Sequence, residues 1–177
     1  MTTVLGLDPG TRHFGWGVIR RQGTRVVHVA HGIAHTDERL SLAERLVTIE
    51  VALVAVLEEH APDEASVEAI FFAKDAQAAA KLGHARGVAL LVCARAGVAV
   101  HEYPPARVKL AVAGNGRADK PQVAQMVRVF LGMTAVPEAD AADALAVALT
   151  HVQRVRLPAA LAAASNVSHA SKSVRRR

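Results

Sequence analysis

Four acidic residues stand in apolar surroundings, where an unpaired carboxylate is costly. Asp8 follows a Val-Leu-Gly-Leu run, Glu68 precedes an Ala-Ile-Phe run, and Asp140 and Asp143 lie in an alanine-rich segment. Carboxylates buried close together repel each other, so they either bind protons or share a cation. Oxygen ligands of this kind suit Mg²⁺ or Mn²⁺ better than Zn²⁺, which prefers histidine and cysteine. The four acids therefore predict a site for hard divalent cations, provided that their segments converge.

Three separate segments would have to meet at this site. Hydropathy predicts a strand at 4–8 that ends in Asp8, and a strand at 65–71 that holds Glu68 in its interior. A helix predicted at 138–153 carries Asp140 and Asp143 three residues apart, which places both carboxylates on one side of the helix. The two strand acids and the paired helix acids could thus face a common point.

Each of these acids also has a simpler interpretation. Asp8 could form the turn before the Pro-Gly pair that follows it, and Glu68 could form a buried ion pair with Lys74. Asp140 and Asp143 could be first-turn acids that stabilise the helix dipole. Spacing alone leaves these alternatives open, since it does not show that the three segments meet.

The remaining elements are predicted from periodicity and turn residues. Strands are expected at 14–20, 25–34 and 98–103, the last one stopped by the prolines at 104–105. Helices are expected at 37–60, where apolar residues recur every three or four positions, at 76–95 after a capping Asp75, and from Asp119 onward. Three strands, a helix, a strand, a helix, a strand and further helices predict an α/β fold with a mixed sheet.

Length and composition exclude several classes of protein. The 177 residues fit one compact domain, and 51% apolar residues argue against a disordered chain. Cys93 stands alone, so no intrachain disulfide can form, and no apolar run reaches the roughly 20 residues that span a bilayer. The sequence therefore predicts a soluble cytoplasmic protein. Residues 1–156 are expected to form the domain, and 157–177 a disordered basic tail.

Charged residues are sorted along the chain. Residues 1–155 hold equal numbers of basic and acidic side chains, so the net charge of +5 comes from the tail. Within the domain, acids gather at 37–68 and bases at 74–128. This distribution indicates a basic face that could bind a polyanion, although chance clustering on a solvated surface would give the same pattern.

Four motifs, in order, resemble those of the RuvC family of Holliday junction resolvases. They lie at 6–12, 67–74, 81–88 and 139–145, the last followed by His151, and the resemblance extends from about residue 4 to 152. It implies a ribonuclease-H-like fold, with a five-stranded mixed sheet flanked by α-helices. It also implies a metal-dependent endonuclease that resolves four-way DNA junctions by paired symmetric nicks in homologous recombination and DNA repair, leaving 5′-phosphate and 3′-hydroxyl ends.

The same resemblance assigns roles to individual residues. The catalytic metal ligands, which would hold two Mg²⁺ or Mn²⁺ ions, are Asp8, Glu68, Asp140 and Asp143. The DNA-binding residues are Phe71, Lys109 and Lys120, with Phe72 as the alternative ring for stacking on a base. Expected partners are four-way junction DNA, a second copy of the chain through the helix around 85–92, and the RuvA–RuvB branch-migration complex, with no membrane. None of His13, His84, His101 and His151 is assigned to this metal site; we expect them to be structural or to support the metal ligands.

Two other functions compete with a nuclease. A junction-binding module that does not cut DNA would need none of the four acids. An actin-like ATPase uses a first turn similar to the one after Asp8, but that fold needs two domains and the chain is too short for them.

Overall fold

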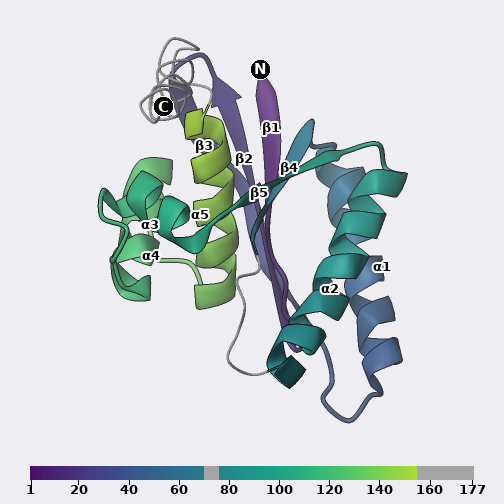
Figure 1. The fold of residues 1–177 in the computed structure, drawn as a ribbon. Helices are drawn as coiled ribbons and strands as arrows, with labels where there is room; N and C mark the ends of the chain where they lie inside the picture. Colours follow the sequence, from purple (N-terminus) through teal and green to yellow (C-terminus); the bar gives the residue numbers. More distant parts are fainter. Residues whose placement is uncertain (70–75, 155–177) are drawn as a thin grey trace, which may run out of the picture.

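The computed structural model describes residues 1–69 and 76–154. One sheet lies between two layers of helices (Figure 1), with α1 and α2 on one face and α3, α4 and α5 on the other. The strands are β1 (Thr2–Asp8), β2 (His13–Gln22), β3 (Arg25–His35), β4 (Glu64–Glu68) and β5 (Ala99–Tyr103). The helices are α1 (Leu42–His60), α2 (Ala76–Arg95), α3 (Pro105–Ala113), α4 (Lys120–Leu131) and α5 (Ala139–Arg154).

The sheet is mixed, as predicted. Its strand order is β3-β2-β1-β4-β5. The first three strands form an antiparallel meander, whereas β4 runs parallel to both β1 and β5. The carboxyl ends of β1 and β4 therefore emerge next to each other at one edge of the sheet.

The structure differs from the sequence predictions at two elements. The prolines at 104–105 do not only end β5; they also begin α3, which the sequence analysis did not foresee. Proline fits the first turn of a helix because the amide hydrogen that it lacks has no helical partner there. Strand β4 ends at Glu68, and Ala69 lies beyond it, so Glu68 terminates the strand and does not lie in its interior. The predicted cap Asp75 lies outside the described residues.

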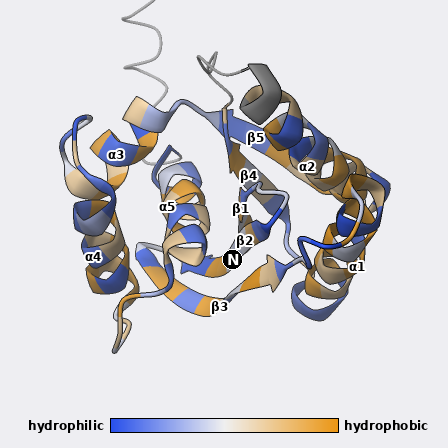
Figure 2. Cartoon of the chain, turned by 90° about the horizontal axis from the view of Figure 1, so that it is seen from below, coloured by the Kyte–Doolittle hydropathy of each residue, from blue (hydrophilic) through white to orange (hydrophobic). Residues whose placement is uncertain are grey.

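Successive side chains of a strand point to opposite faces of the sheet, so each face has its own part of the hydrophobic core. Leu5 and Leu7 of β1 pack in the core beneath α1 and α2, whereas Val4 packs against α5 on the other face. Figure 2 shows α5 next to the sheet, with α3 and α4 outside it. Helix α5 is buried along most of its length, which explains its high alanine content. None of the described helices is long and apolar enough to cross a membrane.

Glycines let α5 approach the sheet more closely than side chains would permit. A Cβ atom added to Gly6 of β1 would lie 1.9 Å from the Ala144 carbonyl oxygen, and one added to Gly15 of β2 would lie 2.1 Å from the Asp140 carbonyl oxygen. Both obstacles are helix backbone, which a rotamer change cannot move away. The first turns of α5 are thereby held directly over the end of β1.

We expect Gly6→Ala to displace α5 from the sheet. The free energy of unfolding should fall by about 1–3 kcal/mol, the usual cost of overpacking a core, as measured by urea denaturation. Gly116→Ala is the matched control, because its added Cβ would lie 3.4 Å from its nearest neighbour. Equal stability of Gly6→Ala and the unmodified chain would show that the close approach is not required.

Candidate active site

Parallel pairing places Asp8 and Glu68 side by side. Leu7 of β1 is opposite Val67 of β4, and each acid is the next residue and the last of its strand. Leu7 and Val67 point toward α1 and α2. Because successive side chains alternate between the faces of a strand, both carboxylates point toward the α5 face.

Helix α5 brings the other two acids to the same place. It begins at Ala139, so Asp140 and Asp143 lie in its first turns. Gly15 lies directly under the Asp140 backbone, which fixes the start of the helix above the strand ends. The ends of β1 and β4 and the start of α5 therefore meet, as the predicted site required.

These groups surround a cavity of about 270 Å³. Its polar lining comes from Asp8, Glu68, Lys109, Lys120 and Asp143, and its apolar wall from Pro105, Val108, Val123 and Val147. Asp140 does not line the cavity, but its charge acts on Asp8. Phe71, Phe72 and Lys74 lie outside the described residues, so the predicted base-stacking ring and the alternative ion pair of Glu68 have no description here.

Burial and mutual repulsion raise the pKa values of the two strand acids. Burial has the largest effect on Asp8, followed by the charges of Asp143 and Asp140, and together they raise its pKa to about 7. The pKa of Glu68 is also raised, first by burial and then by Asp143. The protein without a bound cation thus holds these carboxylates in an unfavourable electrostatic state, which a divalent cation would relieve.

Two lysines partly offset the negative charge. Lys120 Nζ donates a hydrogen bond of 2.6 Å to Asp143 Oδ2, and this contact raises the pKa of Lys120. The charge of Lys109 acts in the opposite direction to burial on Glu68 and favours its ionised form. The start of α4 is fixed by a capping box between Asp119 and Gln122, which also positions Lys120.

The ligand chemistry of the cavity fits hard divalent cations. Its acidic groups offer only carboxylate oxygens, and they lie close enough to shift one another's pKa values. Asp8, Glu68 and Asp143 could hold the cations from the cavity wall, with Asp140 beside them. A different group of side chains whose atoms could bind a metal, Glu64, His101 and His151, lies at the other ends of β4 and α5.

One residue that fixes the geometry of this site was not predicted from the sequence. Arg86 of α2 is buried, its Nη1 donates a hydrogen bond of 2.7 Å to the Glu68 carbonyl oxygen, and its Nη2 lies 2.6 Å from Glu102 Oε1. The side chain therefore ties the last residue of β4 to α2 and β5. Only the tertiary structure identifies it, because a single arginine in a helix is usually exposed.

Residues 4–151 match the protein family described as crossover junction endodeoxyribonuclease RuvC. A protein of that name from Sorangium cellulosum is 58% identical over 160 residues, covering 90% of this chain and 89% of the relative. Another from Parvibaculum lavamentivorans is 55% identical over 149 residues, covering 84% of this chain and 85% of the relative.

Solved structures show the same likeness. The structure of Thermus thermophilus RuvC in complex with a Holliday junction substrate has a TM-score of 0.84 and 37% sequence identity, covering 89% of this chain and 96% of that one. The yeast mitochondrial Holliday junction resolvase Ydc2 has a TM-score of 0.60 at 11% identity, covering 83% of this chain and 76% of that one, and shares the fold. With the five-stranded mixed sheet, these matches confirm the predicted ribonuclease-H-like fold.

The raised pKa of Asp8 predicts how stability depends on pH without divalent cations. Asp8 in the folded protein keeps its proton up to about pH 7, whereas its ordinary value is 3.8. The folded state binds more protons between these values, so its free energy of unfolding falls as the pH rises through this range. Asp8→Asn should remove that loss and be more stable than the unmodified chain at pH 8, by an amount on the order of a few kcal/mol.

Urea denaturation in EDTA at pH 4 and pH 8 measures this difference. The increase in the free energy of unfolding caused by Asp8→Asn should be small at pH 4 and large at pH 8. Glu58→Gln, at an exposed position on α1, should show no such pH-dependent gain. An Asp8→Asn effect that is equal at both pH values would contradict the raised pKa.

The contact between Arg86 and Glu68 predicts a positioning role for Arg86. Arg86→Met keeps the apolar stem but removes both polar contacts, so kcat for phosphodiester cleavage should fall about tenfold or more, since small misplacements of reacting groups are costly. KM for DNA should change little. Arg86→Lys should restore part of the rate, because one ammonium can reach one of the two partners. A folded Arg86→Met with unchanged kcat would exclude the role.

Proposed function

The chain belongs to the RuvC family of crossover junction endodeoxyribonucleases, and on this basis we propose that the acidic cavity at the ends of β1 and β4 is its catalytic centre. The protein is a metal-dependent endonuclease that resolves four-way, or Holliday, DNA junctions in homologous recombination and repair. The observation that carries the assignment of the site is the presence of strand acids, a helix acid and two lysines around one cavity.

The four acids act as ligands for divalent cations. Asp8, Glu68, Asp140 and Asp143 together match the positive charge of two Mg²⁺ or Mn²⁺ ions, so the loaded site can accept an anionic phosphodiester. When bound, such ions supply an activated water and stabilise the charge on the leaving oxygen. The raised pKa values of Asp8 and Glu68 support this role, since these acids gain most from a nearby cation.

The lysines bind the phosphate at the cut strand. Lys120 is paired with Asp143 when no cation is bound, so its ammonium group is released for DNA only when another positive charge satisfies Asp143. Lys109 lies on the same cavity wall. This exchange makes cation binding and DNA binding mutually favourable, and the phosphate contacts make DNA binding weaken with added salt. Phe71 remains the proposed residue for stacking on a base at the opened junction.

A second copy of the chain completes the enzyme. A four-way junction has two-fold symmetry, so two symmetric nicks require two copies of the site. Helix α2 forms part of an outer layer (Figure 1), and its Leu91 is 48% exposed in the single chain. We assign α2 to the contact between copies, which sedimentation velocity of the full chain would test. By family membership, the partners of this cytoplasmic dimer include the RuvA–RuvB complex.

Removing any one of the four acids should abolish cleavage while leaving junction binding intact. We expect Asp8→Asn, Glu68→Gln, Asp140→Asn and Asp143→Asn each to lower the cleavage rate of a synthetic four-way junction by at least about 100-fold in Mg²⁺ or Mn²⁺. The reason is that loss of even an outer-shell partner of a metal costs 10- to 100-fold. Gel mobility shift measures binding separately.

Glu138→Gln is the matched control, because Glu138 is an exposed acid next to the start of α5 and does not line the cavity. It should cut at the normal rate. Linear duplex DNA of the same length should stay uncut by all variants. A folded Asp143→Asn that still cuts the junction normally would contradict the proposed centre.

A further inference from the structure

A histidine-rich cluster lies on the α5 face of the sheet, away from the acidic cavity. Glu64 begins β4 and is opposite Ala99 of β5, whereas His101 lies two residues further along β5, opposite Ser66. Since side chains alternate along a strand, Glu64 and His101 are diagonal neighbours on one face. His151 reaches them from the last turn of α5.

The potential ligand atoms of these three residues are already close together. One atom each from Glu64, His101 and His151 lies within 4.8 Å of the other two. His151 Nε2 is 2.5 Å from Glu64 Oε2, and the rings of His101 and His151 have centroids 4.6 Å apart. Among the described residues, no other group of three or more histidine, cysteine or acidic side chains has its potential ligand atoms within 4.8 Å of one another.

We propose that Glu64, His101 and His151 form a Zn²⁺-binding site that is separate from the catalytic centre. Two imidazoles and one carboxylate are a common three-ligand set for Zn²⁺, and they are poor ligands for Mg²⁺. The ion would take the place of the hydrogen in the contact between His151 Nε2 and Glu64 Oε2. Glu64 is 39% exposed, which leaves an open side for a water molecule as the fourth ligand.

The surroundings of His151 support metal binding through its Nε2 atom. His151 is 4% exposed, and its Nδ1 lies 2.8 Å from the hydroxyl group of Tyr103. A metal-bound histidine usually donates its other ring hydrogen to an oxygen acceptor, which fixes the tautomer and the ring orientation, and the Tyr103 hydroxyl oxygen is able to accept it. Tyr103 thus holds the ring with Nε2 directed toward Glu64.

One neighbouring charge opposes the ion. Arg154 Nη1 lies 3.4 Å from His101 Nδ1 and 3.5 Å from the Tyr103 hydroxyl group. Arg154 is exposed at the end of α5, so its side chain can turn toward solvent when a cation binds. Its positive charge should still weaken Zn²⁺ binding, so a variant that lacks this charge should bind Zn²⁺ more tightly.

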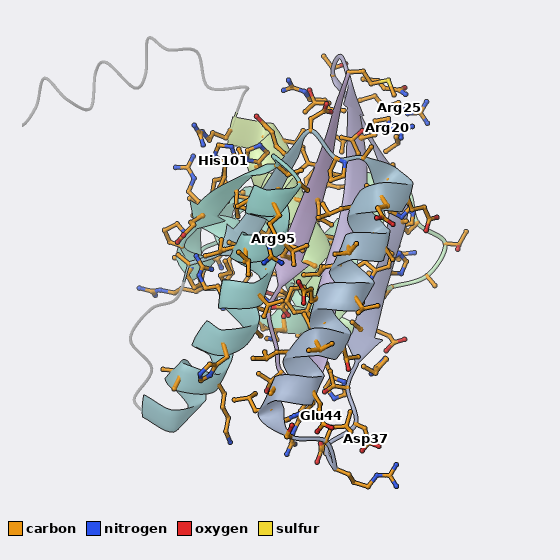
Figure 3. All side chains as sticks on the ribbon, turned by 90° about the vertical axis from the view of Figure 1, so that its right-hand side faces the viewer. Arg20, Arg25, Asp37, Glu44, Arg95 and His101 are labelled. Carbon is orange, nitrogen blue, oxygen red and sulfur yellow. The ribbon has the colours of Figure 1, made fainter. Side chains whose placement is uncertain are left out.

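Metal binding to the histidine cluster and metal binding to the catalytic centre can be measured independently. Glu68 lies four positions after Glu64 along β4, which corresponds to about 13 Å along the strand. Figure 3 shows His101 at the opposite end of the molecule from Asp37 and Glu44. The ligand classes also differ, so excess Mg²⁺ should fill the acidic cavity without displacing Zn²⁺ from the histidines.

The test is a titration of the full chain with Zn²⁺ in excess Mg²⁺, followed by calorimetry, with Co²⁺ absorption as a spectroscopic readout. We expect one Zn²⁺ per chain, a visible Co²⁺ band typical of tetrahedral nitrogen and oxygen ligands, and a higher Tm with Zn²⁺, because the ion links β4, β5 and α5. His101→Ala and Glu64→Gln should each weaken binding by at least about 100-fold. Arg154→Gln should strengthen binding a few-fold.

Two controls separate this site from others. His28→Ala removes one ring of the His28–His31 pair in β3 and should leave Zn²⁺ affinity unchanged. Asp143→Asn disables the acidic cavity and should also leave it unchanged. His101→Ala should cut a four-way junction in Mg²⁺ at the normal rate, which shows that it folds. Absence of Mg²⁺-resistant Zn²⁺ binding, or equal affinity of His101→Ala and the unmodified chain, would overturn the proposal.

Discussion

The arrangement of this protein depends on direct contact between the backbone of α5 and the backbones of β1 and β2. Gly6 and Gly15 allow this contact, since any side chain there would collide with helix carbonyl groups. The contact places Asp140 and Asp143 over the carboxyl ends of two parallel strands. It also explains why α5 consists largely of alanine: small residues are needed wherever a helix is buried this close to a sheet.

The charge balance of the cavity follows from this geometry. The strand acids cannot move away from the helix acids, because each is fixed by an element that is itself packed in the core. The pKa of Asp8 is instead raised to about 7, which favours its protonated form, and Asp143 is paired with Lys120. Both compensations are reversible, so the metal-free protein is stable yet remains able to exchange a proton and an ammonium group for cations and phosphate.

Sequence patterns predicted the features that depend on local order. The apolar run before Asp8 indicated a strand that ends in an acid, and the spacing of Asp140 and Asp143 indicated one helix face; both hold in the structure. Helix α3 escaped prediction because a proline pair ends a strand and begins a helix equally well. The roles of Arg86 and His101 depend on which strands are neighbours and in what register, and local sequence carries no record of either.

The hydrogen bond from Arg86 to the Glu68 carbonyl group connects the outer helix α2 to the proposed catalytic centre through a single side chain. Helix α2 is also the surface assigned to contact with the second copy. A small shift of α2 during assembly would therefore reach Glu68 directly through this side-chain contact. In the proposed dimer, such a connection would couple the two active sites and would favour cutting both strands of a junction in one binding event.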